Sequence, residues 1–149
     1  MPDPVVLLEV DKRGVATITL NRPEVNNAYN GEFVKAMIEA VVSCSNDEAV
    51  RVIVIRGNGK HFQAGADLKW LKEIGKLSPQ ENIDVSRLTA SAIRGLTEVM
   101  KPTIALVHGG CFGGGTGIAA SCDIVVASDD ALFSITETRW GVIASIIVP

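Results

Sequence analysis

One short pattern occurs twice in the chain and constrains its fold more than any other feature. Residues 52–55, Val-Ile-Val-Ile, form a β-branched run that ends in a glycine-rich turn, and a helix is expected from Asp67. Residues 103–107 form a second apolar run, which leads through another glycine-rich turn into a short helix over Ile118–Ser121. Such runs are typical of strands buried on both faces. The repeat predicts an α/β fold with two strand–turn–helix units side by side.

The other expected elements follow from turns and helix caps. Two β-rich runs flank Asp11–Gly14, which predicts a hairpin. Asn30 is a candidate cap for an amphipathic helix, and Ser78–Glu81 reads as a capping box for a long helix that ends before Pro102. Since no low-complexity linker divides the chain, residues 1–149 are expected to form one domain. The remaining predicted strands are Val5–Val10, Val15–Leu20, Ile124–Ala127 and Leu132–Ser134.

Composition excludes several classes of protein. The 14 basic and 17 acidic residues give a net charge of −3, which argues against binding to nucleic acid. No apolar run approaches the ~20 residues of a membrane span, and the first residues do not resemble a signal peptide. Three cysteines without CxxC spacing favour a reducing compartment and predict no metal site. We therefore expect a cytoplasmic protein without membrane contact. The apolar run Val142–Val148 lacks a polar cap, which is the pattern expected of a truncated chain.

The glycine cluster has several possible meanings. Residues 108–117 contain six glycines, and Gly115–Ala120 matches the spacing of a dinucleotide-binding fingerprint, but seven residues separate that match from the preceding strand. Neither a P-loop nor a G-x-S-x-G elbow is present. Two glycine turns at helix N-termini can instead direct two backbone N–H groups at one oxygen, which is the geometry of an oxyanion hole.

Several ordered motifs resemble the crotonase (enoyl-CoA hydratase/isomerase) family over the whole chain. They are residues 21–28 (NRPEVNNA), 62–69 (FQAGADLK), Lys101-Pro102 with Gly113–Gly115, Cys122–Ile124, and Glu137. The resemblance implies a ββα spiral core that lacks the C-terminal helical region. It also implies acyl-CoA thioester substrates, no separate cofactor, and homotrimers that often pair into hexamers.

The resemblance also assigns roles to particular residues. The oxyanion hole corresponds to the backbone N–H groups of Ala66 and Gly114, and one acid/base carboxylate to Glu137. Where ordinary hydratases of the family carry another glutamate, this chain has Gly117, as in the single-glutamate branches. The sequence after Glu137 is closest to hydratases of branched glutaconyl-CoA thioesters. The positions that align with CoA contacts are Val25, Ala64, Ala66, Asp67, Leu68, Lys69 and Gly114.

These residues lead to an expected function with alternatives. The leading hypothesis is hydration of an α,β-unsaturated acyl-CoA, with a methyl- or isohexenyl-glutaconyl-like group as one candidate. The alternatives are an enoyl-CoA isomerase, a feruloyl-CoA-type hydratase-lyase, and a non-catalytic interaction module. Asp67 is expected mainly to cap a helix, and His61 and His108 to be structural donors. For Trp70 and Leu71, ordinary burial in the helix is favoured over the alternative that they line the acyl pocket.

Overall fold

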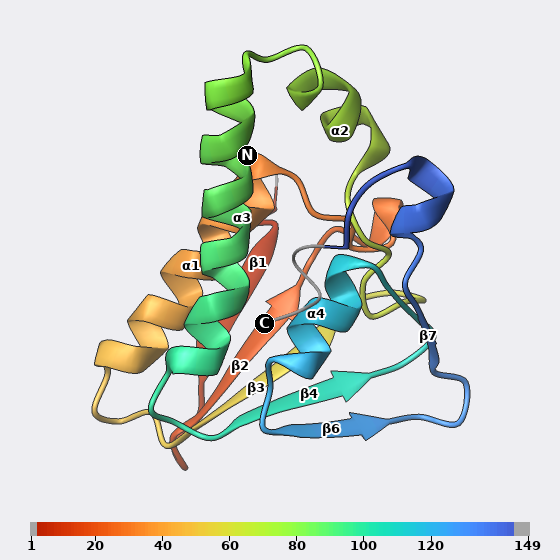
Figure 1. Cartoon of the computed structure of the whole chain (residues 1–149). Helices are drawn as coiled ribbons and strands as arrows, with labels where there is room; N and C mark the ends of the chain where they lie inside the picture. The colour runs from red at the N-terminus through yellow and green to blue at the C-terminus, as the bar shows by residue number, and fades with distance from the viewer. Residues whose placement is uncertain (1–2, 145–149) are drawn as a thin grey trace.

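Five strands form the main sheet, in the order β1-β2-β3-β4-β6, in the computed structural model, which describes residues 3–144 (Figure 1). The first two pair antiparallel as the predicted hairpin, and the other neighbours are parallel. Parallel neighbours need crossover connections, which the helices supply. The strands are β1 (Val6–Val10), β2 (Val15–Leu20), β3 (Val52–Gly57), β4 (Thr103–Val107) and β6 (Ile124–Ala127).

Local capping explains where two of the helices, α1 and α3, begin. Asn30 Oδ1 accepts from the backbone N–H of Phe33 at 2.9 Å, which confirms the first predicted cap. Ser78 and Glu81 form the predicted capping box, each side chain bonding the other's backbone N–H. The helices are α1 (Gly31–Asn46), α2 (Leu68–Ile74), α3 (Pro79–Glu98) and α4 (Gly114–Ala120), with short 3-10 helices η1 (Pro23–Val25) and η2 (Glu137–Trp140).

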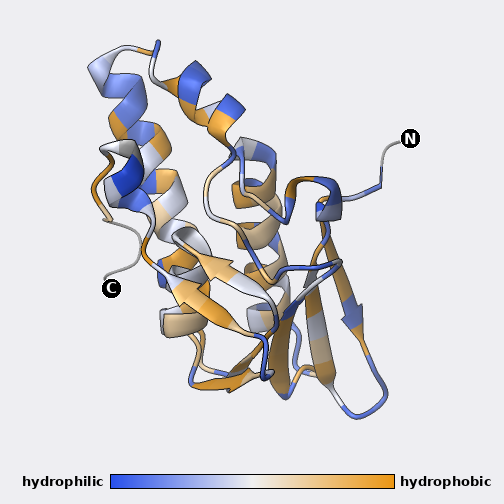
Figure 2. Ribbon diagram, turned by 90° about the vertical axis from the view of Figure 1, so that its right-hand side faces the viewer, coloured by the Kyte–Doolittle hydropathy of each residue, from blue (hydrophilic) through white to orange (hydrophobic). Residues whose placement is uncertain are grey.

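The core lies between the sheet and the helices that cover one of its faces (Figure 2). Alternate residues of the strands point into it, as the two-residue period of a strand requires. The sheet contributes Ala16, Ile18, Leu20, Ile53, Ile55, Ala105 and Val107, and α1 contributes Phe33, Met37 and Val41.

Two expectations about burial and boundaries were wrong. Val52 and Val54 of β3 and Ile104 of β4 are only half-buried, and Leu106 of β4 is exposed, because the helices cover a single face of the sheet. The helix predicted over Ile118–Ser121 begins four residues earlier, at Gly114. The glycine segment also contains β5 (Gly110–Phe112), which pairs in parallel with β7 (Leu132–Ser134).

The apolar run Val142–Val148 falls largely outside the described part of the chain. Residues 145–148 are not described. Val142 and Ile143, which are described, are exposed.

Candidate active site

The two glycine turns lie against each other. They follow the parallel neighbours β3 and β4, so both turns leave the sheet at the same edge. Gln63 binds the second turn through its backbone, donating to Gly110 O at 3.1 Å and accepting from Phe112 N at 2.8 Å. A Cβ atom on Gly113 would lie 3.5 Å from Gly65 Cα. The predicted juxtaposition of the two turns is therefore present.

The segment before α1 holds the first glycine turn, the one that follows β3, in an extended conformation. Tyr29 N donates to Gly65 O at 2.9 Å, and Asp67 N donates to Tyr29 O at 2.9 Å. In an extended segment, alternate residues form backbone hydrogen bonds with the same neighbouring segment. Ala66 lies between Gly65 and Asp67, so its N–H does not donate to Tyr29. Among residues 3–144, no group accepts from the N–H of Ala66 or from that of Gly114, the first residue of α4.

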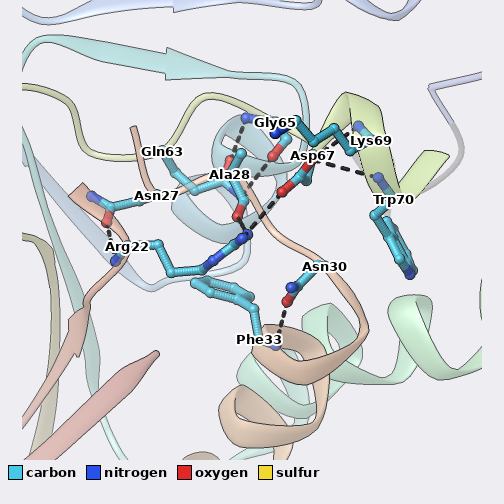
Figure 3. A network of polar contacts seen from close by, with 10 residues as sticks. All are labelled: Arg22, Asn27, Ala28, Asn30, Phe33, Gln63, Gly65, Asp67, Lys69 and Trp70. Atoms are coloured by element: carbon cyan, nitrogen blue, oxygen red, sulfur yellow. Dashed lines mark hydrogen bonds and ion pairs between the residues drawn. The ribbon is translucent and has the colours of Figure 1, made fainter. Parts of the chain in front are cut away.

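An ion pair between Arg22 and Asp67 holds the first turn in place (Figure 3). Arg22 Nη2 lies 3.1 Å from Asp67 Oδ2, with only 13% and 15% of the two side chains exposed. Arg22 Nη1 donates to Ala28 O. The other carboxylate oxygen of Asp67 accepts from Lys69 N at 2.9 Å and Trp70 N at 3.5 Å, which confirms Asp67 as the cap of α2.

Two fully buried amides complete the support. Asn27 Nδ2 donates to the carbonyls of Asn58, His61 and Phe62, and its Oδ1 accepts from Arg22 N at 2.8 Å. Gln63 Oε1 accepts from Gly65 N at 2.8 Å. Buried amides bonded on both ends rigidify the backbone around them. The first turn is therefore held at both ends.

Glu137 brings a carboxylate to the junction of the two turns. It is the first residue of η2 and follows β7, which pairs with β5 of the second turn. A Cβ atom on Gly113 would lie 2.8 Å from Glu137 Oε1. Glu137 Oε2 is shielded from solvent and has no hydrogen-bond partner within the part of the chain that the structure describes.

A cavity of about 360 Å³ opens beside these groups. Glu137, Ala66 and Gly113 line it together with Tyr29. Its other walls come from the first turn, α2, α3 and the residues on either side of η2. These further lining residues are Ala64, Gly65, Leu68, Trp70, Leu71, Ile74, Asn82, Val85, Ser86, Thr89, Thr136, Val142 and Ile143.

The pKa values of two side chains around the site, Tyr29 and Asp67, are shifted in opposite directions. Burial, and then the negative charge of Glu137, raise the pKa of Tyr29 above its ordinary value, so the phenol is neutral. For Asp67, burial alone would raise the pKa, but hydrogen bonds from Arg22, Lys69 N and Trp70 N, and the charge of Arg22, lower it. Asp67 is therefore ionised and engaged in structure.

The structure brings together some of the sequence-predicted residues. Glu137, Ala66, Ala64 and Leu68 line the main cavity, whereas Gly114 lines a smaller one beside it. The predicted CoA contacts Val25, Asp67 and Lys69 lie outside both sets of lining residues. His108 Nε2 lies 2.9 Å from Gly59 O, and His61 Nδ1 accepts from Gly110 N at 2.8 Å. Both histidines are therefore structural, but His61 is an acceptor rather than the expected donor.

Sequence reasoning was wrong about two residues and missed three others. Trp70 and Leu71, expected to be ordinary buried residues, line the cavity, because α2 turns that side toward the active-site turns rather than toward the core. Tyr29, Thr89 and Arg22 were missed. Each is placed by contacts with segments distant in sequence, so no local pattern marks them.

Within residues 3–144, no helix is both long and apolar enough to cross a membrane. The same residues contain no cluster of three or more His, Cys, Asp or Glu side chains arranged to hold a metal ion.

Comparison with known proteins defines the family. The family model for enoyl-CoA hydratase/isomerase matches residues 11–148. A short-chain-enoyl-CoA hydratase of Clostridium acetobutylicum is 38% identical over 138 residues, which are 92% of this chain and 51% of that protein. A hydroxycinnamoyl-CoA hydratase-lyase of Pseudomonas fluorescens is 38% identical over 134 residues, 87% of this chain and 49% of that protein.

Comparison with solved structures indicates the same family. An enoyl-CoA hydratase from Shewanella pealeana superposes with a TM-score of 0.93 at 31% identity, covering 97% of this chain and 54% of that one. The chain belongs to the enoyl-CoA hydratase/isomerase family and has its crotonase-type fold. It spans about half the length of the curated relatives it matches.

Proposed function

We propose that the chain carries the catalytic core of an enzyme that hydrates α,β-unsaturated acyl-CoA thioesters, with Glu137 as the acid/base group. The position of Glu137 carries this proposal. Its carboxylate meets the junction of the two glycine turns, and Oε2 is buried without a partner among residues 3–144. A buried acceptor without a donor is costly, so such atoms mark sites where a ligand supplies the missing hydrogen bond. Water bound beside the substrate is such a donor.

The N–H groups of Ala66 and Gly114 form the oxyanion hole in this proposal. Both turns lie at one edge of the sheet, and neither N–H is used by another group of residues 3–144. When water adds, the thioester carbonyl gains negative charge as an enolate. Two fixed donors stabilise that charge, and the loss of one typically costs ~3–4 kcal/mol.

One carboxylate serves both proton transfers. Water adds its oxygen to Cβ while Glu137 takes the released proton, and Glu137 then delivers that proton to Cα of the enolate. The product is a 3-hydroxyacyl-CoA, and the carboxylate is regenerated. No cofactor or metal takes part in this scheme. The position of a second family glutamate is Gly117, a buried residue of α4, so we infer that the space a glutamate would take admits a β-branched acyl group.

The CoA moiety is proposed to follow the first turn and α2. Ala64, Ala66 and Leu68 support this path because they line the main cavity. Val25, Asp67 and Lys69 stay part of the proposed path on the family resemblance. The proposal also places the reaction in the cytoplasm, supported by three free cysteines, Cys44, Cys111 and Cys122.

Isomerisation and hydratase-lyase cleavage are the two alternative reactions, and both are tested together with hydration. The family description includes isomerases, and the Pseudomonas fluorescens relative is named a hydratase-lyase. Hydration removes the conjugated alkene, isomerisation moves it, and a hydratase-lyase also releases an aldehyde. Product analysis on crotonyl-CoA, 3-methylcrotonyl-CoA and feruloyl-CoA therefore separates the three reactions. Mass spectrometry detects the added water and the released aldehyde, and isomerisation is detected as a loss of the conjugated absorbance without a change in mass.

The decisive experiment compares Glu137→Gln with the wild-type full chain. The variant keeps the shape of the side chain and removes the base, so turnover is expected to fall at least ~10²-fold while acyl-CoA binding persists. Glu73→Gln, an exposed glutamate of α2, controls for the loss of one negative charge and should retain full turnover. Equal turnover in Glu137→Gln and wild type would overturn the mechanism. Absence of both binding and turnover in the wild type would favour an interaction module.

A further inference from the structure

The hydroxyl of Tyr29 is a second polar group of the main cavity that has no partner among residues 3–144. Tyr29 lines this cavity together with Glu137. Burial and then the charge of Glu137 raise the pKa of the phenol, and no hydrogen bond from the described residues offsets them. The hydroxyl of a buried tyrosine usually has a hydrogen-bond partner. This hydroxyl is therefore available to a molecule bound in the cavity.

The two glycine turns bring Tyr29 and Glu137 to the same part of the cavity. Tyr29 pairs with Ala66 of the first turn, and its N–H donates to Gly65 O at 2.9 Å. The Cβ position of Gly113, in the second turn, lies 3.5 Å from Gly65 Cα and 2.8 Å from Glu137 Oε1. The carboxylate therefore approaches the part of the first turn to which Tyr29 is bonded.

Packing holds the ring that carries the hydroxyl. The ring of Tyr29 packs edge-to-face on Trp70, with ring centroids 5.7 Å apart and an interplanar angle of 69°. On its other side Tyr29 lines a smaller cavity, where the only other polar side chain among the lining residues is Thr89. The Thr89 hydroxyl already donates to Val85 O at 2.8 Å. The main cavity, which Glu137 lines, is therefore the side on which the Tyr29 hydroxyl can bind a partner.

We propose that the Tyr29 hydroxyl and Glu137 Oε2 together hold the water molecule that adds to the substrate. The inference rests on the proposed function. Glu137 Oε2 is a buried acceptor without a donor among residues 3–144, and the Tyr29 oxygen is a second acceptor at the same cavity. A water that donates one hydrogen to each of them presents its lone pairs to Cβ. It is thereby bound in the orientation that the addition needs.

The addition balances without any further group. The water oxygen forms a bond to Cβ, and the hydrogen donated to Glu137 passes to the carboxylate as a proton and then to Cα. The hydrogen donated to Tyr29 stays on the oxygen and becomes that of the product hydroxyl. Tyr29 keeps its own proton throughout, in agreement with its raised pKa. Tyr29 therefore positions the water, whereas Glu137 transfers the proton.

The test on the full chain separates the addition of water from proton transfer at Cα. Hydration of crotonyl-CoA or 3-methylcrotonyl-CoA needs both steps, whereas exchange of the Cα hydrogens of butyryl-CoA in D₂O needs only Glu137 and the enolate. Tyr29→Phe keeps the ring, so kcat for hydration should fall about tenfold, the effect of one lost hydrogen bond. Its KM and its rate of deuterium exchange, followed by mass spectrometry, should stay at the wild-type values. Glu137→Gln should lose both hydration and exchange.

Three further variants test whether another hydroxyl holds the water. Besides Thr89, Ser86 and Thr136 are the remaining serine and threonine residues that line the main cavity. Ser86→Ala and Thr136→Val should each lower kcat less than Tyr29→Phe does. Ser91→Ala removes an exposed hydroxyl of α3 and should leave hydration unchanged.

The possible outcomes keep the two proposals apart. Hydration by Tyr29→Phe at the wild-type rate, or a larger fall in Ser86→Ala or Thr136→Val, overturns the role of Tyr29. An equal fall in hydration and in deuterium exchange also overturns it, because the hydroxyl then acts on Glu137 or on the acyl group. These results leave the hydratase proposal intact. A wild type that neither hydrates an enoyl-CoA nor exchanges the Cα hydrogens overturns the proposed function and this inference with it.

Discussion

The carboxylate of Glu137 occupies the space that a side chain at Gly113 would need. A Cβ atom at residue 113 would lie 2.8 Å from Glu137 Oε1, and Gly113 has φ +52°, which L side chains rarely adopt. Glycine at 113 therefore meets two requirements at once: it permits the turn, and it lets the carboxylate approach the backbone.

Replacing Gly113 by alanine should damage both stability and turnover. The positive φ costs about 1–3 kcal/mol, and the new Cβ displaces the Glu137 carboxylate. Gly141→Ala is the matched control, because Gly141 has φ +65° but, apart from its chain neighbours, no atom of residues 3–144 lies within 4 Å of its Cβ position. Gly141→Ala should lose stability without a comparable loss of turnover per folded molecule. Urea denaturation and steady-state kinetics measure the two effects, and equal turnover in both variants would contradict the assignment.

The ion pair between Arg22 and Asp67 should contribute measurably to stability because both side chains are largely buried. In a double-mutant cycle with Arg22→Met and Asp67→Asn, we expect a coupling energy of about 1 kcal/mol. Asparagine still caps α2, so the cycle isolates the charge interaction. The exposed pair Arg13–Asp11 serves as the control and should show no measurable coupling. A coupling energy of zero in the Arg22/Asp67 cycle would show that the ion pair does not stabilise the site.

Asp67 should also make stability depend on acid pH. Its pKa is lowered on folding, so its contribution is complete above the ordinary value of 3.8 and is lost as pH falls through the folded value. The difference in unfolding free energy between wild type and Asp67→Asn should therefore shrink below about pH 4. Chemical denaturation from pH 7 to pH 2.5 follows it, and a difference that stays constant would contradict the assignment.

Tyr29 should act at the opposite end of the pH range. Its pKa is raised on folding, so the unfolded chain loses the phenol proton first, and stability declines above its ordinary value of 10.0. Tyr29→Phe has no such proton and should lose less stability between pH 9 and about 11. Thermal melts across this interval measure the effect, and parallel curves for the two proteins would count against a buried phenol.

The edge strand β6 should promote self-association of the 149-residue chain. Ile124, Val125 and Val126 are exposed on it, and an exposed apolar edge pairs readily with another chain. We propose this surface as a contact in the trimers or hexamers that the family resemblance implies. Val126→Lys should lower the sedimentation coefficient at a given concentration, whereas Val42→Lys, an exposed valine on α1, should not. Identical sedimentation of wild type and Val126→Lys would exclude β6 from the contact.

Features with local signals could be predicted from the sequence. Asn30, Asp67 and Ser78 cap helices through neighbours two or three residues away, so their types and positions alone mark the helix starts. The two glycine turns could be paired because parallel strands place their ends at one edge.

Features that depend on the distant packing of segments could not be predicted. Whether Val52 and Val54 are covered on their second face depends on which sides of the sheet carry helices, and a single strand does not encode that. Trp70 lines the cavity because of the orientation of α2, which its own sequence does not determine. The β5–β7 pair could not be predicted, because β5 begins with glycine, which has a low strand propensity. The strand forms through its pairing with β7.

The Arg22–Asp67 bond joins residues 45 positions apart, and the site around it draws on segments spread from residue 22 to residue 143. Contacts of such long range form slowly, because a large loop must close before any of them stabilises the chain. Of the residues proposed to act in the reaction, Glu137 is synthesised last, after both turns. A ribosome-bound nascent chain can therefore acquire its sheet and two turns while the proposed acid/base carboxylate is still absent. The proposed reaction then requires the segment that carries Glu137 to dock.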